Sequence, residues 1–320
     1  MLHSFVRRFI GHRALSAPTQ HLSTMTTIDI RHGNAFELLK SIPDASVHFV
    51  LTDPPYFIDG MGDDWDNSNL QRKASKAGVV GSLPVGMKFD PQQGRKFQRF
   101  MEPICEEIYR VLKPGGFAVI FSQARLYGRL AVAAEDAGFE IRDMLGWTYE
   151  GQAKAFSQSH FVRRMSHLSA AEKESVLRQL DGRKTPQLKP CIEPMVMAQK
   201  PRIGTFVENW LQHEVGLVDT KQSLDGKFPG NLMPCPKPSK AEKGIGNEHL
   251  TVKPVALLEH LIKLFTVEGQ TVLDPFLGSG STAVAAQAAS RDCIGIEIER
   301  NYVRIAEERV ANAVEQGVLL

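Results

Sequence analysis

Residues 53–56, Asp-Pro-Pro-Tyr, combine groups that could act on the exocyclic amine of a nucleobase. Such an amine is a poor nucleophile, because its lone pair is delocalised into the ring. The Asp53 carboxylate and the Pro54 carbonyl can each accept an N–H bond from it, which localises the lone pair and stabilises the charge of the transition state. Tyr56 can stack on the base, and Pro55 helps to end the preceding strand. The alternative is a stiff loop in which Asp53 only caps a turn.

A second candidate site is the segment 272–282 (VLDPFLGSGST), which follows one expected strand and opens one expected helix. Gly278 and Gly280 would let the backbone approach a ligand closely. The helix N-terminus offers N–H donors to a carboxylate, such as that of a methionine-derived cofactor. A dinucleotide is disfavoured, because Ala283 replaces the third glycine of its fingerprint. Glu297, after the next expected strand, could accept both hydroxyls of a ribose.

Strand and helix patterns alternate around both segments, which predicts a mostly parallel sheet flanked by helices. Ligands bind such sheets beyond the carboxyl ends of the strands, where both segments stand. The expected strands are 28–31, 47–52, 117–122, 145–149, 193–198, 271–273 and 293–298. The expected helices are 35–40, 100–112, 126–137, about 170–180, 254–265, 282–289 and 301–314.

Basic residues concentrate in two stretches, although the net charge of the 320-residue chain is only +2. Residues 70–99 hold seven Lys and Arg against one Asp, and residues 148–246 hold fifteen against ten acidic residues. Both stretches suit a polyanionic partner, with solvated surface loops as the alternative. No apolar run approaches the roughly 20 residues that cross a bilayer, so we expect no membrane partner.

The cysteines and the first residues bear on localisation. Cys105, Cys191, Cys235 and Cys293 are scattered without zinc-site spacing, so we expect no bound metal and a reducing, cytoplasmic setting. Residues 1–27 form a basic extension without acidic residues, similar in composition to a mitochondrial presequence. Translation from Met25 is the interpretation we favour, and mitochondrial import is the alternative.

Four segments together resemble the amino-group DNA methyltransferases that carry a catalytic Asp-Pro-Pro-Tyr motif. They are LTDPPYF (51–57), NEHLTVKP (247–254), LDPFLGSGST (273–282) and GIEIERNY (295–302). The catalytic motif precedes the cofactor motif, which is the circularly permuted order of the beta class. The resemblance implies an α/β fold with a Rossmann-like, seven-stranded, mostly parallel sheet and one antiparallel strand.

The resemblance also assigns roles to residues. Asp53, Pro54, Pro55 and Tyr56 would be catalytic, and S-adenosyl-L-methionine would be the cofactor, with no metal. Glu297 would bind the ribose, Asn34 would lie near the cofactor adenine, and residues 251–254 would help to hold the methionine part. The expected cofactor-binding residues are Asn34, Thr251, Lys253, Pro254, Asp274, Pro275, Phe276, Gly278, Ser279, Gly280 and Glu297.

Residues 28–149 and 247–320 would form the catalytic domain. Residues 150–246 would supply a sheet-completing strand and a variable target-recognition segment, assisted by the basic loop 70–99. Double-stranded DNA would be the partner, and a second copy of the chain or a cognate restriction endonuclease could join it. The candidate DNA contacts, for which solvated surface is an equal alternative, are Lys73, Lys76, Arg163, Arg164, Arg183 and Lys184.

We therefore expect methyl transfer to N6 of adenine at a specific sequence, by a cytoplasmic, bacterial or phage-encoded, nucleoid-associated enzyme. Methylation of cytosine N4 uses the same chemistry and stays open, although aspartate before Pro-Pro favours adenine. RNA, a protein glutamine amide and a non-catalytic DNA-binding module are weaker alternatives. Methylation of cytosine C5 needs a nucleophilic thiolate, and Cys235 stands in a Pro-rich stretch instead of at a strand end.

Overall fold

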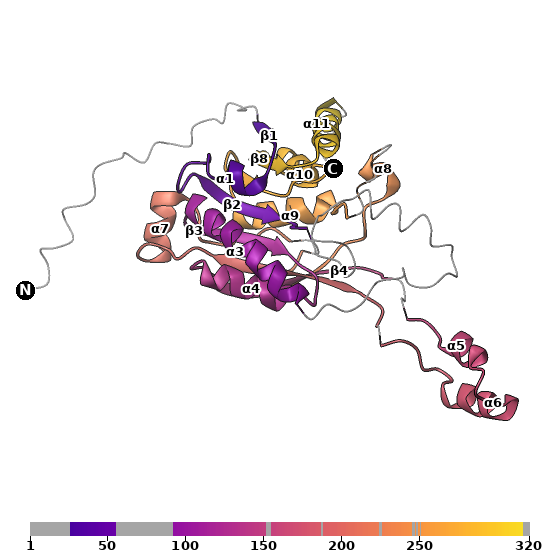
Figure 1. Cartoon of the computed structure of the whole chain (residues 1–320). Helices are drawn as coiled ribbons and strands as arrows, with labels where there is room; N and C mark the ends of the chain where they lie inside the picture. Colours follow the sequence, from indigo (N-terminus) through magenta and orange to yellow (C-terminus); the bar gives the residue numbers. More distant parts are fainter. Residues whose placement is uncertain are drawn as a thin grey trace, which may run out of the picture.

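One eight-stranded sheet forms the centre of the computed structural model, in the order β1-β8-β7-β2-β3-β5-β4-β6 (Figure 1). The structure describes residues 26–55, 92–151, 155–186, 188–223, 226–244, 247, 249 and 251–315. The strands are β1 (Ile28–His32), β2 (Val47–Thr52), β3 (Leu112–Phe121), β4 (Glu140–Thr148), β5 (Ile192–Gln199), β6 (Leu232–Pro234), β7 (Thr271–Asp274) and β8 (Asp292–Glu297). Only β5 runs antiparallel to its neighbours in this sheet, which confirms the mostly parallel sheet with one reversed strand.

The eighth strand corrects the expectation of seven. β6 has three residues and pairs in parallel with the outer side of β4, from Gly146–Leu232 to Thr148–Pro234. The Pro-rich sequence around it predicted irregular chain, but a proline is tolerated in a short edge strand, where one N–H needs no partner.

Strand β3 also begins earlier than expected, at Leu112 instead of residue 117. The Lys-Pro-Gly-Gly sequence ends helix α3 (Gln93–Val111) as predicted and then continues as strand. The register of β2 against β3 shifts between Val47 and Phe49, which absorbs this segment. Gly115 has φ +82°, and a Cβ there would lie 2.3 Å from the side chain of Asn209, so the turn needs glycine.

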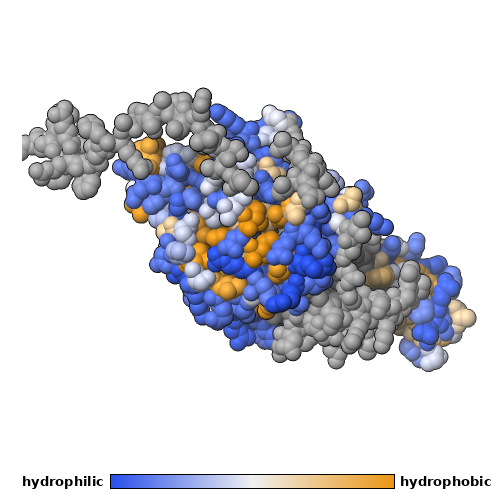
Figure 2. All heavy atoms as spheres, turned by 90° about the horizontal axis from the view of Figure 1, so that it is seen from above, coloured by the Kyte–Doolittle hydropathy of each residue, from blue (hydrophilic) through white to orange (hydrophobic). Residues whose placement is uncertain are grey.

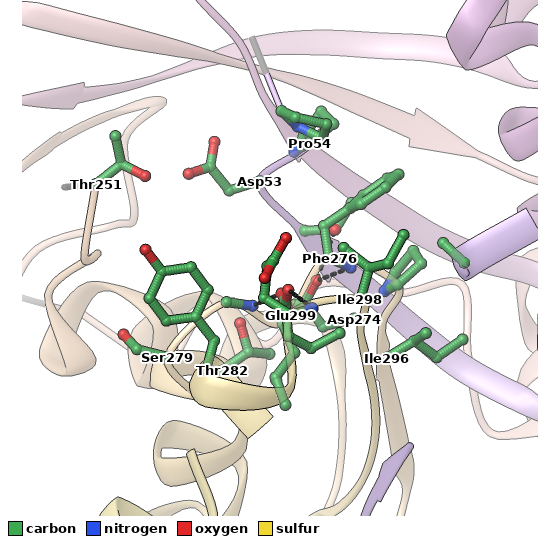
Figure 3. A pocket seen from close by; sticks show the side chains of 18 of the residues that line it. Asp53, Pro54, Thr251, Asp274, Phe276, Ser279, Thr282, Ile296, Ile298 and Glu299 are labelled. Atoms are coloured by element: carbon green, nitrogen blue, oxygen red, sulfur yellow. Dashed lines mark hydrogen bonds between the residues drawn. The ribbon is translucent and has the colours of Figure 1, made fainter. Parts of the chain in front are cut away.

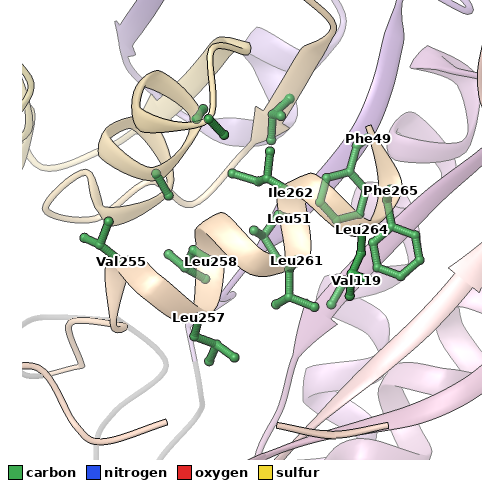
Figure 4. Close-up of a cluster of buried hydrophobic side chains, with 14 of the residues drawn as sticks. Phe49, Leu51, Val119, Val255, Leu257, Leu258, Leu261, Ile262, Leu264 and Phe265 are labelled. Carbon is green, nitrogen blue, oxygen red and sulfur yellow. The ribbon is translucent and has the colours of Figure 1, made fainter. Parts of the chain in front are cut away.

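Helices cover both faces of the sheet. One layer holds α1 (Ala35–Leu39), α3 and α4 (Tyr127–Asp136), and the other holds α9 (Val255–Phe265), α10 (Ser281–Ala288) and α11 (Arg300–Glu315). The side chains of a strand alternate between these layers. Phe49 and Leu51 pack with the α9 side chains, as Figure 4 shows, whereas Val50 packs in the cluster of α3 and α4.

Helices α5 (Ser159–Arg164) and α6 (Ala170–Gln179) form an arm that projects away from the sheet (Figure 1). Helix α6 buries none of its residues, and it begins with a capping box between Ser169 and Glu172. Figure 2 shows the arm at one end of the molecule, with polar and apolar residues mixed on its surface. Helices α5, α7 (Phe206–His213) and α8 (Lys240–Lys243) had no counterpart in the sequence analysis.

Several predictions lie outside the described residues. These are the character of residues 1–25, the stacking role of Tyr56, and the DNA contacts of Lys73 and Lys76. Within the described ranges, no helix combines the length and the apolar character that a membrane crossing requires.

Candidate active site

The two sequence motifs meet because β2 and β7 are neighbours in the sheet. The strands pair in parallel, Phe49 with Val272 and Val50 with Leu273, so their carboxyl ends share one edge. Asp53 follows β2 directly, and Asp274 ends β7. A cavity of about 650 Å³ lies at this edge.

Most of the predicted site residues within the described ranges line this cavity. They are Asn34, Asp53, Pro54, Pro55, Thr251, Lys253, Asp274, Pro275, Phe276, Gly278, Ser279 and Glu297. Figure 3 shows Asp53 and Thr251 on one side of the pocket, with Ser279, Thr282 and Glu299 on the other. The structure therefore brings residues 53–55 and the 274–279 segment into one space, as the sequence predicts.

Gly280 and Pro254 do not line the cavity. Gly280 is the N-cap of α10 with φ +87°, and a Cβ there would lie 2.7 Å from the Cβ of Ala306 on α11. This glycine therefore lets α10 and α11 pack closely. Pro254 is the N-cap of α9 and sets the start of that helix.

Two buried carboxylates hold the glycine loop between β7 and α10 from inside. Asp274 accepts hydrogen bonds from the Thr52 hydroxyl at 2.6 Å and from the Phe276 N–H at 3.0 Å. Glu297 accepts from the N–H groups of Gly278 and Glu299, each at 2.8 Å. Burial raises the pKa of Asp274 to about 6, and burial also raises the pKa of Glu297.

These bonds refine the ribose prediction. The Glu297 carboxylate already fixes two backbone N–H groups, although an ionised carboxylate has room for further donors. Glu299 is exposed and also lines the cavity, so the pocket holds a further carboxylate that was not predicted. The sequence signal for Glu299 is its position two residues after Glu297, within the segment 295–302 that resembles the family.

Arg309 and His249 hold the loop from outside. Arg309 of α11 donates to the Ser279 carbonyl at 2.6 Å and to the Ser281 hydroxyl at 3.2 Å. The His249 ring packs edge-on against Tyr302, with ring centroids 4.7 Å apart. Burial lowers the pKa of His249 to about 4, so the ring is neutral near pH 7. Neither role was predicted, although His249 and Tyr302 stand inside the quoted segments.

Asn34 uses its side chain locally. Its amide oxygen accepts the Phe36 N–H at 2.9 Å and so caps α1. Phe36, Phe100 and Phe276 also line the cavity, and the ring centroids of Phe100 and Phe276 are 6.0 Å apart. This apolar wall suits a flat aromatic group.

On the catalytic side, the ammonium of Lys253 forms ion pairs with both Asp53 and Glu193. The distance from Lys253 Nζ to Glu193 is 3.0 Å, and only 6% of the Lys253 side chain is exposed. Burial alone would lower the pKa of Lys253, but the two carboxylates outweigh burial and raise it. The ion pairs of Lys253 are thus with Asp53 and Glu193, whereas its sequence motif predicts a contact with the cofactor.

The candidate DNA contacts lie away from the cavity. Arg163 and Arg164 end α5, and Arg183 and Lys184 follow α6, where Lys184 bridges to Ser157 at the base of the arm. Among the residues that the structure describes, no group of three or more His, Cys, Asp or Glu side chains could hold a metal ion.

Comparison with known proteins decides the family. A family model described as DNA methylase, covering N6 and N4 methyltransferases, matches residues 47–308. The chain belongs to this DNA methylase family. The methylase is 30% identical to the type II methyltransferase M.HindIII of Haemophilus influenzae, over 85% of this chain and 91% of that relative. It is 27% identical to M2.DpnII of Streptococcus pneumoniae, over 87% and 88% of the two chains.

Solved structures confirm the Rossmann-like fold of the methylase. A DNA modification methylase from Thermus thermophilus, complexed with S-adenosyl-L-methionine, superimposes with a TM-score of 0.55 at 22% identity, over 90% of this chain and 95% of that one. The cytosine-N4-specific PvuII DNA methyltransferase gives 0.59 at 18% identity, over 91% and 92%. Both likenesses concern the fold.

Proposed function

We propose that this methylase transfers a methyl group from S-adenosyl-L-methionine to N6 of an adenine that is flipped out of double-stranded DNA at a specific sequence. The observation that carries the proposal is the shared cavity of the Asp53-Pro54 segment and the glycine loop. Family membership supports the reaction class, and the hydrogen-bond acceptors of Asp53 and Pro54 support an amine as the methyl acceptor.

The cavity fits the proposed cofactor. The wall of Phe36, Phe100 and Phe276 suits its adenine, and the Glu297 and Glu299 carboxylates suit ribose hydroxyls. The loop that opens α10 would hold the methionine part, because a helix N-terminus attracts a carboxylate. The Thermus thermophilus neighbour is complexed with this same molecule. When bound, it supplies an electrophilic methyl group.

The protein's own contribution to the reaction is to make the amine nucleophilic. Asp53 and the Pro54 carbonyl, at the end of β2, would accept the two N–H bonds of the amine and localise its lone pair. Extruding the base costs a few kcal/mol of stacking and pairing energy, which contacts in the pocket must offset. We assign Tyr56 the stacking role on its sequence position.

Cytosine N4 is the second candidate target, because its amine would fit the same acceptors. The test incubates the purified methylase with the cofactor and several unmethylated genomic DNAs, then identifies the modified nucleoside by mass. We expect N6-methyladenine. N4-methylcytosine would favour the second candidate, and 5-methylcytosine or no modified base would refute the proposal.

We also propose that residues 150–246 contain the target-recognition segment and that the arm contacts DNA phosphates. Replacing Arg163 and Arg164 by Gln should weaken DNA binding and reduce the slope of log affinity against log salt by about one per phosphate contact. Arg178→Gln is the control for the loss of one charge, compared with half the effect of the double variant, because Arg178 lies in the same arm but pairs with Glu174. Equal effects for each charge removed would contradict a specific role for α5.

The remaining assignments stay predictions. They are the homodimer, the cognate endonuclease and the cytoplasmic, nucleoid-associated location. The four cysteines carry free thiols, which accords with a reducing setting.

A further inference from the structure

A buried ammonium joins two carboxylates at the catalytic edge. Lys253 Nζ contacts Asp53 and Glu193 and lies 4.9 Å from the centre of the Phe121 ring. The carboxylate side chains are 18% and 19% exposed, so water screens the three charges only in part. The group has two negative charges and one positive charge.

The reversed strand explains why Glu193 reaches this place. β5 runs against β3 and β4, so it begins at the edge where the parallel strands end. Glu193 is its second residue and pairs with Trp147 near the end of β4. Lys253 comes from a different segment, just before α9.

The chemistry of the proposed reaction requires net negative charge here. The target nitrogen becomes positive as its lone pair takes the methyl group from the sulfonium, whose sulfur leaves as a neutral thioether. A carboxylate stabilises that charge until the nitrogen loses one proton to solvent. Asp53 paired with Lys253 alone would form a neutral pair, whose field largely cancels at the amine. Glu193 restores one net negative charge and gives the ammonium a second acceptor.

We propose that Glu193 is a positioning residue for methyl transfer, which binds Lys253 and so leaves the Asp53 carboxylate able to stabilise the target amine. This inference rests on the proposed function. Glu193 acts through Lys253 and need not touch the cofactor or the base. Its loss should therefore slow the reaction without weakening the binding of either substrate.

The decisive variant is Glu193→Gln, which keeps the shape and an acceptor oxygen but removes the charge. We expect kcat to fall about tenfold, less than the ~10²–10³-fold typical of losing a group that contacts the reacting atoms. KM for DNA, cofactor affinity by equilibrium dialysis and the unfolding midpoint should stay within error of wild type. Glu193→Asp should restore part of kcat, because it restores the charge.

Glu150→Gln is the matched control. Glu150 follows β4 at the same edge, is exposed and pairs with Lys189, so its loss changes the net charge equally. We expect wild-type kcat for this variant. In a Lys253→Met background, Glu193→Gln should lower kcat no further, because Glu193 has lost the partner through which it acts.

Three results would overturn the inference. They are an unchanged kcat in Glu193→Gln, a loss of cofactor binding or stability that accounts for the lower rate, and additive effects with Lys253→Met. The wild-type enzyme separates this failure from that of the proposed function. An inactive wild type would refute both, whereas an active wild type with an unaffected Glu193→Gln variant would refute this inference alone.

Discussion

The two halves of the cavity are held together by different forces. In the half that we assign to the cofactor, the glycine loop is fixed through its own backbone. The Gly278 N–H donates to the Glu297 carboxylate, which also accepts the Glu299 N–H, and Arg309 donates to the Ser279 carbonyl. In the half that we assign to catalysis, Asp53 pairs with the ammonium of Lys253, which also pairs with Glu193.

This difference has a functional meaning. Bonds to the backbone preform the shape of the loop, so cofactor binding should depend on how well the cofactor fits that loop. Ion pairs between side chains can exchange partners when a substrate amine arrives, so catalysis should depend on charge. Variants in one half should therefore leave the other half's function largely intact.

The largest expected effect is that of Asp53→Ala. Removing the main acceptor should lower kcat by about 10²–10³-fold or more, because the amine then loses its transition-state stabilisation. Cofactor affinity, measured by equilibrium dialysis, should stay near normal, since the glycine loop keeps its own bonds. A parallel loss of cofactor binding would show that Asp53 has a structural role. The two halves of the cavity would then not function independently.

Much of the fold could be predicted from the sequence, because local patterns encode it. The apolar run of β2 and the glycine loop before α10 can each be recognised from a few consecutive residues. The order of the motifs can be read directly along the chain. These patterns predicted seven of the strands and brought Asp53 and Asp274 to one edge, although β3 and β4 begin at Leu112 and Glu140, before the expected residues 117 and 145. The short strand β6 was not predicted, because its pairing with β4 is long-range and its prolines argue against a strand.

The contacts within the site were less predictable. Lys253 and Glu193 lie on segments that only the tertiary fold brings together, and no local pattern records their ion pair. Arg309 likewise reaches the glycine loop from α11, 30 residues further along the chain than Ser279. Motifs therefore identified which residues line the cavity, whereas the partners of their charges required the structure.

The next effect concerns stability and pH. Burial raises the pKa of Asp274 from 3.8 to about 6, so between these values the folded protein binds more protons than the unfolded chain. Its free energy of unfolding falls as pH rises through this range. Asp274→Asn removes that contribution. The free energy of unfolding of the variant, relative to that of wild type, should therefore increase from pH 4 to 6 by up to about 3 kcal/mol and stay constant above that range.

Urea titrations of both proteins at several pH values would measure this difference. His249 has the opposite sign, because its pKa falls from 6.5 to about 4 and its contribution to stability is lost as pH falls through that range. His249 is present in both proteins, so its contribution cancels in the difference between their free energies of unfolding. A pH-independent difference between them would show that Asp274 does not titrate as a buried acid.

A tenfold effect is expected for Gly278→Ala. Gly278 has φ +55°, and a Cβ there would lie 2.9 Å from Nε2 of His249, so the loop must shift. We expect cofactor affinity to fall about tenfold, as ~1.4 kcal/mol of misfit would give. Gly269→Ala is the control, because Gly269 has φ +77° with open space around it. It should cost similar stability and leave cofactor binding unchanged. Equal weakening by both would attribute the effect to backbone strain alone.

The smallest effect should come from Arg309→Met. The change removes the donors to the Ser279 carbonyl and the Ser281 hydroxyl but keeps an apolar chain of similar length. Because Asp274 and Glu297 still hold the loop from inside, cofactor affinity should fall only about threefold, the loss of roughly one modest hydrogen bond. Arg304→Met on the same helix is the control, since Arg304 is exposed and pairs with Glu308. If Arg304→Met weakened the cofactor as much, α11 would act through its charge and the loop would not be fixed from outside.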